Sequence, residues 1–359
     1  MFITNEKSNM STLYSSFYLY RKYEVIGNEL VDLGITSIDA DGTQELVMKE
    51  ECDQACGCTP SDPVYRWVQT EDTICVEYVP PTPTIDGKFR LTLSDSSTVS
   101  AECDSTSAIT SGEVSSQYSG TVVSAEIGNC VTSIGTEAFR RCTGLTSVDT
   151  PNTVTSIGNN AFEQCYYLQN ITIPNSATNI GDRAFQMCVS LSDITIPDSV
   201  TSIGEYAFDT CERATGITIG NSVTTIGKAS FLNCRSATTL TIGNNVTSIG
   251  DYAFSNCEAL TSITIPNSVR TIGEDAFKAA LYATSLTIGS GVTYIGEYAF
   301  MNCGRLQSIT IYATTPPTLA YEYEFYDSNC PIYVPAGSVN AYKTATNWST
   351  NASRIQAIP

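Results

Sequence analysis

Cysteine side chains are the first candidates for chemistry in this sequence, which contains 14 of them among 359 residues. Seven stand in a series with a 23-residue spacing, in which Ala280 takes the place of one cysteine. They are Cys142, Cys165, Cys188, Cys211, Cys234, Cys257 and Cys303. Free cysteine is among the most frequently buried residues, and alanine fills the same position, so we expect small buried side chains with reduced thiols. Reactive thiols or a ladder of disulfides are the alternatives.

A second group of four cysteines lies near the N-terminus. They are Cys52, Cys56, Cys58 and Cys75. Four thiolates could hold a structural zinc ion, but zinc sites usually contain C-x2-C pairs, which this spacing lacks. Disulfides or free thiols are therefore favoured over zinc. Cys103 and Cys130 could form a further disulfide that clamps the region before the regular series.

Histidine is absent, which excludes Ser-His-Asp and Cys-His catalysis and imidazole metal sites. No phosphate loop, dinucleotide-binding glycine pattern or nucleophile elbow is present. Carboxylates recur singly at equivalent positions, which predicts a solvated acidic stripe rather than the converging pair of a glycosidase. They are Asp182, Glu205, Asp251, Glu274 and Glu297. We therefore expect no catalytic residues, no metal and no cofactor.

Tyrosines at variable positions are the candidates for a binding surface. Aromatic side chains on a polar, repeated surface are typical of contacts with proteins or sugars. The alternative is that these tyrosines cover seams between neighbouring repeats. They are Tyr166, Tyr167, Tyr206, Tyr252, Tyr282, Tyr294 and Tyr298.

All these side chains belong to, or flank, a 23-residue repeat. The glycine of an Ile-Gly pair recurs eight times without insertion, from Gly135 to Gly296, and a phenylalanine follows each glycine by four residues. Isoleucines two positions apart with threonine between them predict a short strand. The segment E/D-x-A-F-x-x-C predicts a helical turn, with phenylalanine and cysteine on its inner face. One repeat offers only a few core side chains, so the repeats must stack into a solenoid.

The consensus S-V-T-S-I-G-x-x-A-F-x-x-C-x-x-L-x-x-I-T-I-P-x closely resembles the BspA-like class of leucine-rich repeats. The match runs from about Val123 to Val334. That class occurs in surface proteins of gut and oral bacteria, in mucosal protozoa and in viruses of gut bacteria. The resemblance implies an α+β repeat solenoid of leucine-rich-repeat coils with a protein-binding or adhesive role. It carries no ligand-contacting residue over to this chain.

The repeat also sets the predicted domain boundaries. Residues 1–78 lack the period and contain extended segments, which predicts a small β-rich attachment domain. Residues 79–85 form a proline-rich linker. Residues 86–122 are predicted to cap the solenoid and 123–311 to form its leucine-rich repeats. Residues 312–359 are predicted to form a degenerate repeat and a C-terminal cap that shields the last core layer.

Charge and hydropathy narrow the possible partners. The chain has 37 acidic and 18 basic residues and a net charge of −19, which disfavours nucleic acid and anionic membranes. No apolar run approaches the ~18 residues of a membrane span, so membrane insertion is not expected. The first residues, MFITNEKSNM, lack the pattern of a signal peptide.

These features predict a non-enzymatic interaction protein. Residues 1–78 would dock to a larger assembly, and the solenoid would bind a protein or glycan receptor. A structural or host-attachment component of a bacteriophage virion, made in the host cytoplasm, needs no export signal. It is favoured because no such signal is visible and because the resemblance extends to viruses of gut bacteria. A bacterial cell-surface or secreted adhesin and a purely structural decoration protein are the alternatives.

Overall fold

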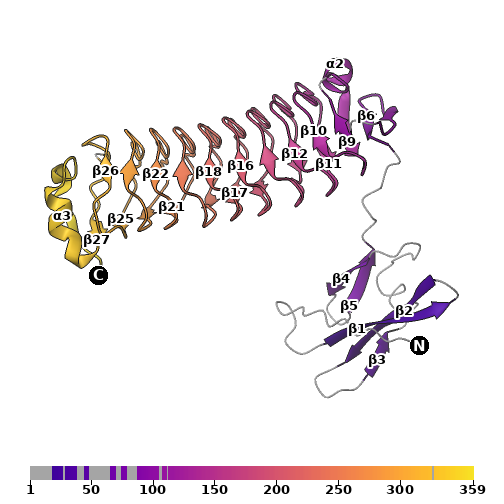
Figure 1. The fold of residues 1–359 in the computed structure, drawn as a ribbon, viewed down its shortest axis with the longest axis horizontal. Helices are drawn as coiled ribbons and strands as arrows, with labels where there is room; N and C mark the ends of the chain where they lie inside the picture. Colours follow the sequence, from indigo (N-terminus) through magenta and orange to yellow (C-terminus); the bar gives the residue numbers. More distant parts are fainter. Residues whose placement is uncertain are drawn as a thin grey trace. The chain divides into compact units, whose positions relative to one another are not determined.

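The computed structural model divides the chain into two compact units, Met1–Pro83 and Thr84–Pro359 (Figure 1). In the first unit it describes the backbone of five strands. In the second it describes residues 87–104, 107–110, 112–325 and 327–359. None of the helices in the described part of the chain has the length and apolar character that a membrane span requires.

The described part of the first unit is antiparallel β-structure. Its strands are β1 (Tyr18–Ile26), β2 (Glu29–Ile38), β3 (Gln44–Val47), β4 (Tyr65–Gln69) and β5 (Ile74–Tyr78). β2 pairs with both β1 and β3, and β4 pairs with β5. Outside the described residues lie Cys52, Cys56, Cys58 and the side chain of Cys75. Their expected state, disulfides or free thiols rather than a zinc site, stays a prediction.

The second unit is a solenoid in which the repeating coils contribute short strands to two faces (Figure 1). On one face, ten two-residue strands form a continuous parallel sheet. They are β8 (Ala108–Ile109), β10 (Ser133–Ile134), β12 (Ser156–Ile157), β14 (Asn179–Ile180), β16 (Ser202–Ile203), β18 (Thr225–Ile226), β20 (Ser248–Ile249), β22 (Thr271–Ile272), β24 (Tyr294–Ile295) and β26 (Thr318–Leu319).

The other face consists of three smaller sheets. The first contains β6 (Phe89–Leu93), β7 (Thr98–Ala101), β9 (Val122–Ile127), β11 (Ser147–Asp149) and β13 (Asn170–Ile171). The second contains β15 (Ile194–Ile196), β17 (Gly216–Ile219) and β19 (Thr239–Thr241). The third contains β21 (Ser262–Ile265), β23 (Ser285–Ile288), β25 (Ser308–Ile311), β27 (Ile332–Val334) and β28 (Ile355–Ala357). The described helices of this unit are short: α2 (Ser115–Tyr118), η1 (Ala336–Ser338), α3 (Val339–Thr344) and η2 (Ser349–Asn351).

Strand pairing follows the 23-residue register that the sequence predicts. Val148 lies opposite Ala125, Ile309 opposite Ile332, and Ile332 opposite Ile355. In β15 and β21 the isoleucines are buried and the threonine between them is exposed. This period of two places one apolar column in the core and leaves one polar column outside.

A stack of phenylalanine rings runs along the core. From Phe139 to Phe300, the centroids of neighbouring rings lie 5.0–5.5 Å apart and the ring planes differ by 2–17°. Phe325 and Trp348 continue the series at 5.8 and 5.7 Å. The core is therefore one column, in which each coil is packed mainly against its two neighbours.

Where the sequence predicts a helical turn, the structure has consecutive tight turns. The Ala138 amide donates to the Gly135 carbonyl in its own coil, but the Phe139 amide donates to Ala161 of the next coil, at 2.7 Å. Glu137 has a φ of 58°, in the left-handed region that a right-handed helix does not contain. The neighbouring coil presents backbone carbonyls at the repeat spacing. Alternate amides donate to these carbonyls, whereas in an α-helix each amide donates to the carbonyl four residues earlier in its own chain.

The N-terminal end of the solenoid is closed by β6, β7 and α2. Lys88 is 1% exposed, and its Nζ lies 2.8 Å from carboxylate oxygens of both Asp104 and Glu113. A disulfide joins Cys103 of the cap to Cys130 at the start of the regular coils, as the sequence allows. The charge pairing thus holds segments of the cap together, and the disulfide ties the cap to the first coil.

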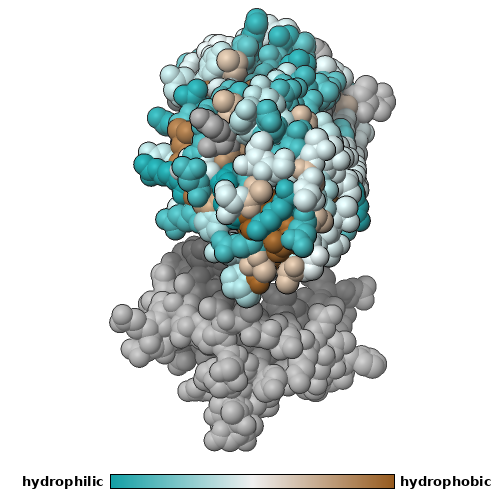
Figure 2. Space-filling view, turned by 90° about the vertical axis from the view of Figure 1, so that its left-hand side faces the viewer, coloured by the Kyte–Doolittle hydropathy of each residue, from teal (hydrophilic) through white to brown (hydrophobic). Residues whose placement is uncertain are grey.

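At the C-terminal end, two large aromatic side chains cover the core. Tyr342 and Trp348 are both fully buried. The Tyr342 hydroxyl donates to the Ala313 carbonyl at 2.9 Å, and the Trp348 indole N–H donates to Pro317 at 2.7 Å. Figure 2 looks onto this end, where hydrophilic and neutral residues prevail and apolar ones form small separate spots. The last core layer is therefore shielded from water.

The register changes between the last regular coil and this cap. Phe325 follows Phe300 by 25 residues instead of 23. In the preceding coil the Phe277 amide donates to the Ala299 carbonyl of the next coil, but at Phe300 the longer spacing displaces the equivalent carbonyl. Glu324 Oε1 accepts from the Phe300 amide at 3.0 Å, and Asp327 Oδ2 accepts from the Asn302 amide at 2.8 Å. Two carboxylates thus replace two carbonyls. Burial raises the pKa of Glu324, which is 1% exposed, to about 7.

Candidate binding surface

The repeat cysteines pack in the core with free thiols, which confirms the prediction. All seven are at most 1% exposed. The Cys165 thiol donates to the Phe139 carbonyl of the preceding coil at 3.1 Å, and Cys303 donates to Phe277 at 3.5 Å. This bond explains the preference for cysteine over alanine, which the spacing alone does not reveal. Burial raises the pKa of Cys142 and Cys303 to about 12.

We expect the repeat thiols of the native protein to react with a thiol reagent at least tenfold more slowly than after unfolding. The thiolate is the reactive form, burial raises the pKa of Cys188 and Cys211, and the coils block access to the sulfur atoms. Peptide mapping by mass spectrometry after native labelling measures this for each site. Disulfides between successive repeat cysteines would contradict it. The sites to follow are Cys165, Cys188, Cys211, Cys234 and Cys257.

Carboxylates of the predicted acidic stripe bind backbone amides of the next coil. Asp182 Oδ1 accepts from the Glu205 amide at 2.9 Å, and Asp251 Oδ1 accepts from the Glu274 amide at 2.9 Å. The described residues contain no cluster of three Asp, Glu, Cys or His side chains that could hold a metal ion. These two aspartates therefore stabilise the stacking of coils rather than standing free in solvent.

Three of the candidate tyrosines share one position of the coil, two residues after the glycine, with φ of 56–59°. A cationic side chain lies near the face of each ring. The pairs are Arg183 with Tyr206 at 5.2 Å, Lys228 with Tyr252 at 5.9 Å, and Lys278 with Tyr298 at 5.8 Å. Cation–π contacts of this kind stabilise neighbouring coils. These three rings thus already have partners within the chain.

Tyr298 also belongs to an aromatic cluster that the sequence analysis missed. Tyr321 lies 4.7 Å from it in an edge contact, and Tyr323, which is 46% exposed, lies 5.4 Å from Tyr321. A hydrogen bond with Glu297 raises the pKa of Tyr298 to about 12. Tyr321 could be found from the repeat register, because it follows Tyr298 by 23 residues.

The other candidate tyrosines lie elsewhere on the coils. Tyr166 is half-buried and Tyr167 is 61% exposed, directly after a repeat cysteine. Tyr282, at the matching corner of a later coil, lies under the Arg305 guanidinium at 4.4 Å. Tyr294 lies in β24 and is 41% exposed. The seven tyrosines thus occupy four different positions of the coil rather than one patch.

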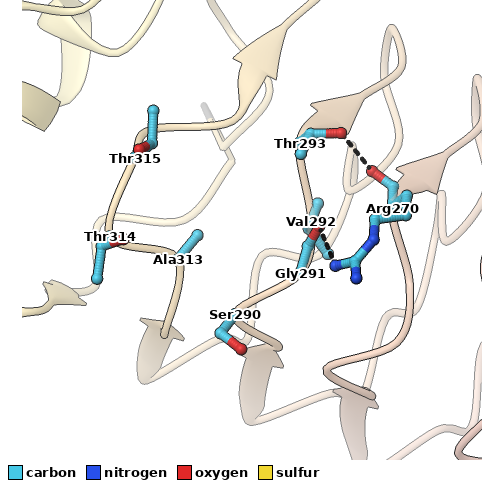
Figure 3. Close-up of a pocket in the computed structure, with 8 residues that line it drawn as sticks. All are labelled: Arg270, Ser290, Gly291, Val292, Thr293, Ala313, Thr314 and Thr315. Atoms are coloured by element: carbon cyan, nitrogen blue, oxygen red, sulfur yellow. Dashed lines mark hydrogen bonds between the residues drawn. The ribbon is translucent and has the colours of Figure 1, made fainter.

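A hollow of about 260 Å³ opens beside β24, near the C-terminal cap (Figure 3). Its lining comes from segments 290–293 and 313–315 of successive coils and from Arg270. Arg270 Nη1 donates to the Gly291 carbonyl at 3.0 Å, and the Thr293 hydroxyl donates to the Arg270 carbonyl at 3.1 Å. The sequence analysis missed Arg270. It can be found by aligning the repeats, because it stands where the other coils have threonine.

Solved structures of similar proteins are bacterial leucine-rich-repeat proteins. One from Bacteroides ovatus is 25% identical over 79% of this chain and 71% of its own, with a TM-score of 0.46. A leucine rich cell surface protein from Faecalibacterium prausnitzii is 23% identical over 84% and 95%, with a TM-score of 0.44. A leucine-rich-repeat protein from T. pallidum is 26% identical over 55% and 82%, with a TM-score of 0.40. No curated protein shows significant sequence similarity.

The repeat itself matches a family model. The model describes a BspA type leucine-rich repeat region in six copies, and it matches residues 115–238 and 224–334. These ranges cover more than half of the chain and contain the glycine, phenylalanine and cysteine series that build the stacked coils. The chain therefore belongs to the family of BspA type leucine-rich-repeat proteins.

Proposed function

We propose that this protein is a non-enzymatic binding protein, in which the solenoid contacts a macromolecular receptor and residues 1–78 attach it to a larger assembly. The observation that carries the proposal is the capped solenoid, whose single core supports a long surface with variable side chains. Ten parallel strands spaced by ~4.8 Å give a face on the order of 45 Å long. That length is sufficient for a protein–protein interface of ordinary size.

The chemistry of the described side chains supports binding rather than catalysis. The repeat thiols donate to core carbonyls, and Asp182 and Asp251 bind amides of the next coil. The repeat thiols and these two carboxylates therefore help to hold the coils together. Leucine-rich-repeat solenoids are typically binding scaffolds, with extended surfaces that suit large partners.

For the setting, we propose the bacterial cell surface or the surrounding medium. The disulfide between Cys103 and Cys130 favours this setting, because structural disulfides persist mainly in oxidising compartments. A bacteriophage virion, which the sequence analysis favours, is the second candidate, because there too residues 1–78 would attach and the solenoid would bind. The two settings differ in whether the protein is found on the bacterial envelope or on a virus particle.

The experiment locates the full-length protein and its parts in the source culture. An antibody against the chain is used on cell envelopes and on purified particles, and we expect the envelope fraction to contain the protein. Residues 1–85 fused to a fluorescent reporter should join the same assembly, and residues 86–359 should not. Recovery with particles would assign the protein to a virion. Attachment through residues 86–359 would reverse the roles of the two parts.

A further inference from the structure

We propose that the hollow beside Arg270 and Tyr294 binds a sugar residue that carries a carboxylate, such as a hexuronic acid unit of a surface glycan. The proposal rests on the binding function above and names the ligand class for one part of the solenoid. It depends on two departures from the repeat that line this hollow, Arg270 and Gly291 (Figure 3). Two further departures lie in the adjoining strand β24, at Tyr294 and in its pairing with Thr318.

The repeat changes in four ways at this one place. Arg270 replaces a threonine that the other seven coils share, and Tyr294 replaces serine, threonine or asparagine. Gly291 stands where the other coils have serine, asparagine, threonine or cysteine. The following strand pairs Tyr294 with Thr318 after 24 residues instead of 23. The column of Arg270 is threonine in every other coil, so the stacking of coils does not require an arginine there.

Gly291 makes room for the Arg270 side chain. A Cβ atom at position 291 would lie 2.0 Å from Arg270 Nη1 and 2.0 Å from the Asn267 carbonyl oxygen. Without it, Nη1 approaches the backbone and donates to the Gly291 carbonyl. A guanidinium has five N–H donors in a rigid fork, and the hydrogen bonds described for this side chain use one nitrogen. The other edge is left for a ligand.

The charge of the hollow suits a single carboxylate. Guanidinium and carboxylate groups match in a two-pronged geometry, which makes arginine the preferred partner. None of the eight residues that line the hollow is acidic. The net charge of −19 repels polyanions over longer distances, so a sugar with one carboxylate is favoured over a polyphosphate or a nucleic acid.

The rest of the surroundings suits a pyranose ring. Ser290, Thr314 and Thr315 are polar residues of the lining, and the Ser290 hydroxyl donates to Asn267 Oδ1 at 3.2 Å. Tyr294 and Tyr312, each next to a lining residue in the sequence, are 41% and 48% exposed. A tyrosine ring combines a flat apolar face with a hydroxyl, which complements the two kinds of surface on a sugar. A volume of about 260 Å³ is small among ligand pockets and fits one sugar residue.

The experiment compares two glycosides on the full-length protein. Methyl β-D-glucuronide and its neutral counterpart methyl β-D-glucoside are titrated and followed by saturation-transfer NMR. We expect the glucuronide to bind in the millimolar range and the glucoside at least tenfold more weakly. Inorganic phosphate is tested as a competitor and should displace the glucuronide poorly, because it offers no ring to the tyrosines.

Variants that restore the repeat keep the fold and test the site. Arg270→Thr introduces the residue of the other seven coils and should weaken glucuronide binding at least tenfold. Tyr294→Ser likewise restores a residue found in other coils and should weaken binding of both glycosides. Arg213→Thr, which removes an exposed arginine in another coil, is the matched control and should change neither affinity.

Three results would overturn the proposal: equal affinity for the two glycosides, no glucuronide binding, or unchanged binding by Arg270→Thr. Displacement by phosphate at equal affinity would make this a general anion site and remove the sugar assignment. Each of these results leaves the location experiment above unaffected. A failure of the ligand class is therefore distinguishable from a failure of the proposed function.

Discussion

Replacing Phe208 by alanine is expected to lower the free energy of unfolding of the solenoid by about 3–5 kcal/mol. Phe208 is 1% exposed, and its ring centroid lies 5.0 Å from Phe185 and 5.3 Å from Phe231. The substitution removes both stacking contacts and leaves a cavity between coils. Chemical denaturation followed by circular dichroism measures the loss. Damage in the middle of a stack should also split unfolding of the solenoid into separate transitions.

The matched control is an aromatic residue at the surface. Tyr167 is 61% exposed, so Tyr167→Ala should change the free energy of unfolding by less than about 0.5 kcal/mol. A melting temperature of Phe208→Ala within a degree or two of the unaltered protein would show that the ring is not part of the core.

The second large effect is a loss of stability at the C-terminal end of the solenoid as the pH rises from about 5 to about 7. Burial, and secondarily the nearby Asp275 carboxylate, raises the pKa of Glu324 from 4.5 to about 7 in the folded chain, although backbone N–H groups oppose the shift. In this pH range the folded state keeps the proton and the unfolded chain has lost it. The free energy of unfolding therefore falls by roughly 3 kcal/mol in all.

The variant Glu324→Gln isolates this effect. Its amide oxygen can still accept from the Phe300 amide, but it carries no charge at any pH. We expect the variant to be more stable than the unaltered protein at pH 8 and to lack the decline between pH 5 and pH 7. Asp327→Asn is the matched control, since this exposed residue bridges the same junction, and it should keep the decline. Identical pH profiles for Glu324→Gln and the unaltered protein would contradict the assignment.

The stacked core could be predicted from the sequence because every coil repeats the same contacts. The isoleucine pairs, phenylalanines and cysteines recur at one spacing, which determines both the strand register and the inner face. The turn after each glycine could not be predicted in the same way. Phenylalanine and cysteine three residues apart fit a helical turn and a pair of tight turns equally well. The difference lies in carbonyls such as that of Ala161, which the next coil supplies.

The candidate surface was only partly predictable, because exposure depends on the neighbouring coil. Tyr206 and Tyr167 are both tyrosines at variable positions, yet Arg183 covers the first and the second is 61% exposed. Arg270 was overlooked because a single arginine in a repeat looks like an ordinary surface residue. Its role depends on Gly291, which follows in the next coil and makes room for its side chain.

The uniform register between Gly135 and Gly296 has a consequence for how such a chain can change over generations. Exchange between two copies of the repeat at the gene level adds or removes units of 23 residues and restores the same neighbours on both sides of the junction. Each event would shift the N-terminal cap relative to the hollow by about 4.8 Å per coil, while Arg270, Gly291 and the C-terminal cap stay together. The distance between the N-terminal cap and the proposed binding site is thus a quantity that selection can adjust in discrete steps, without altering either end of the solenoid.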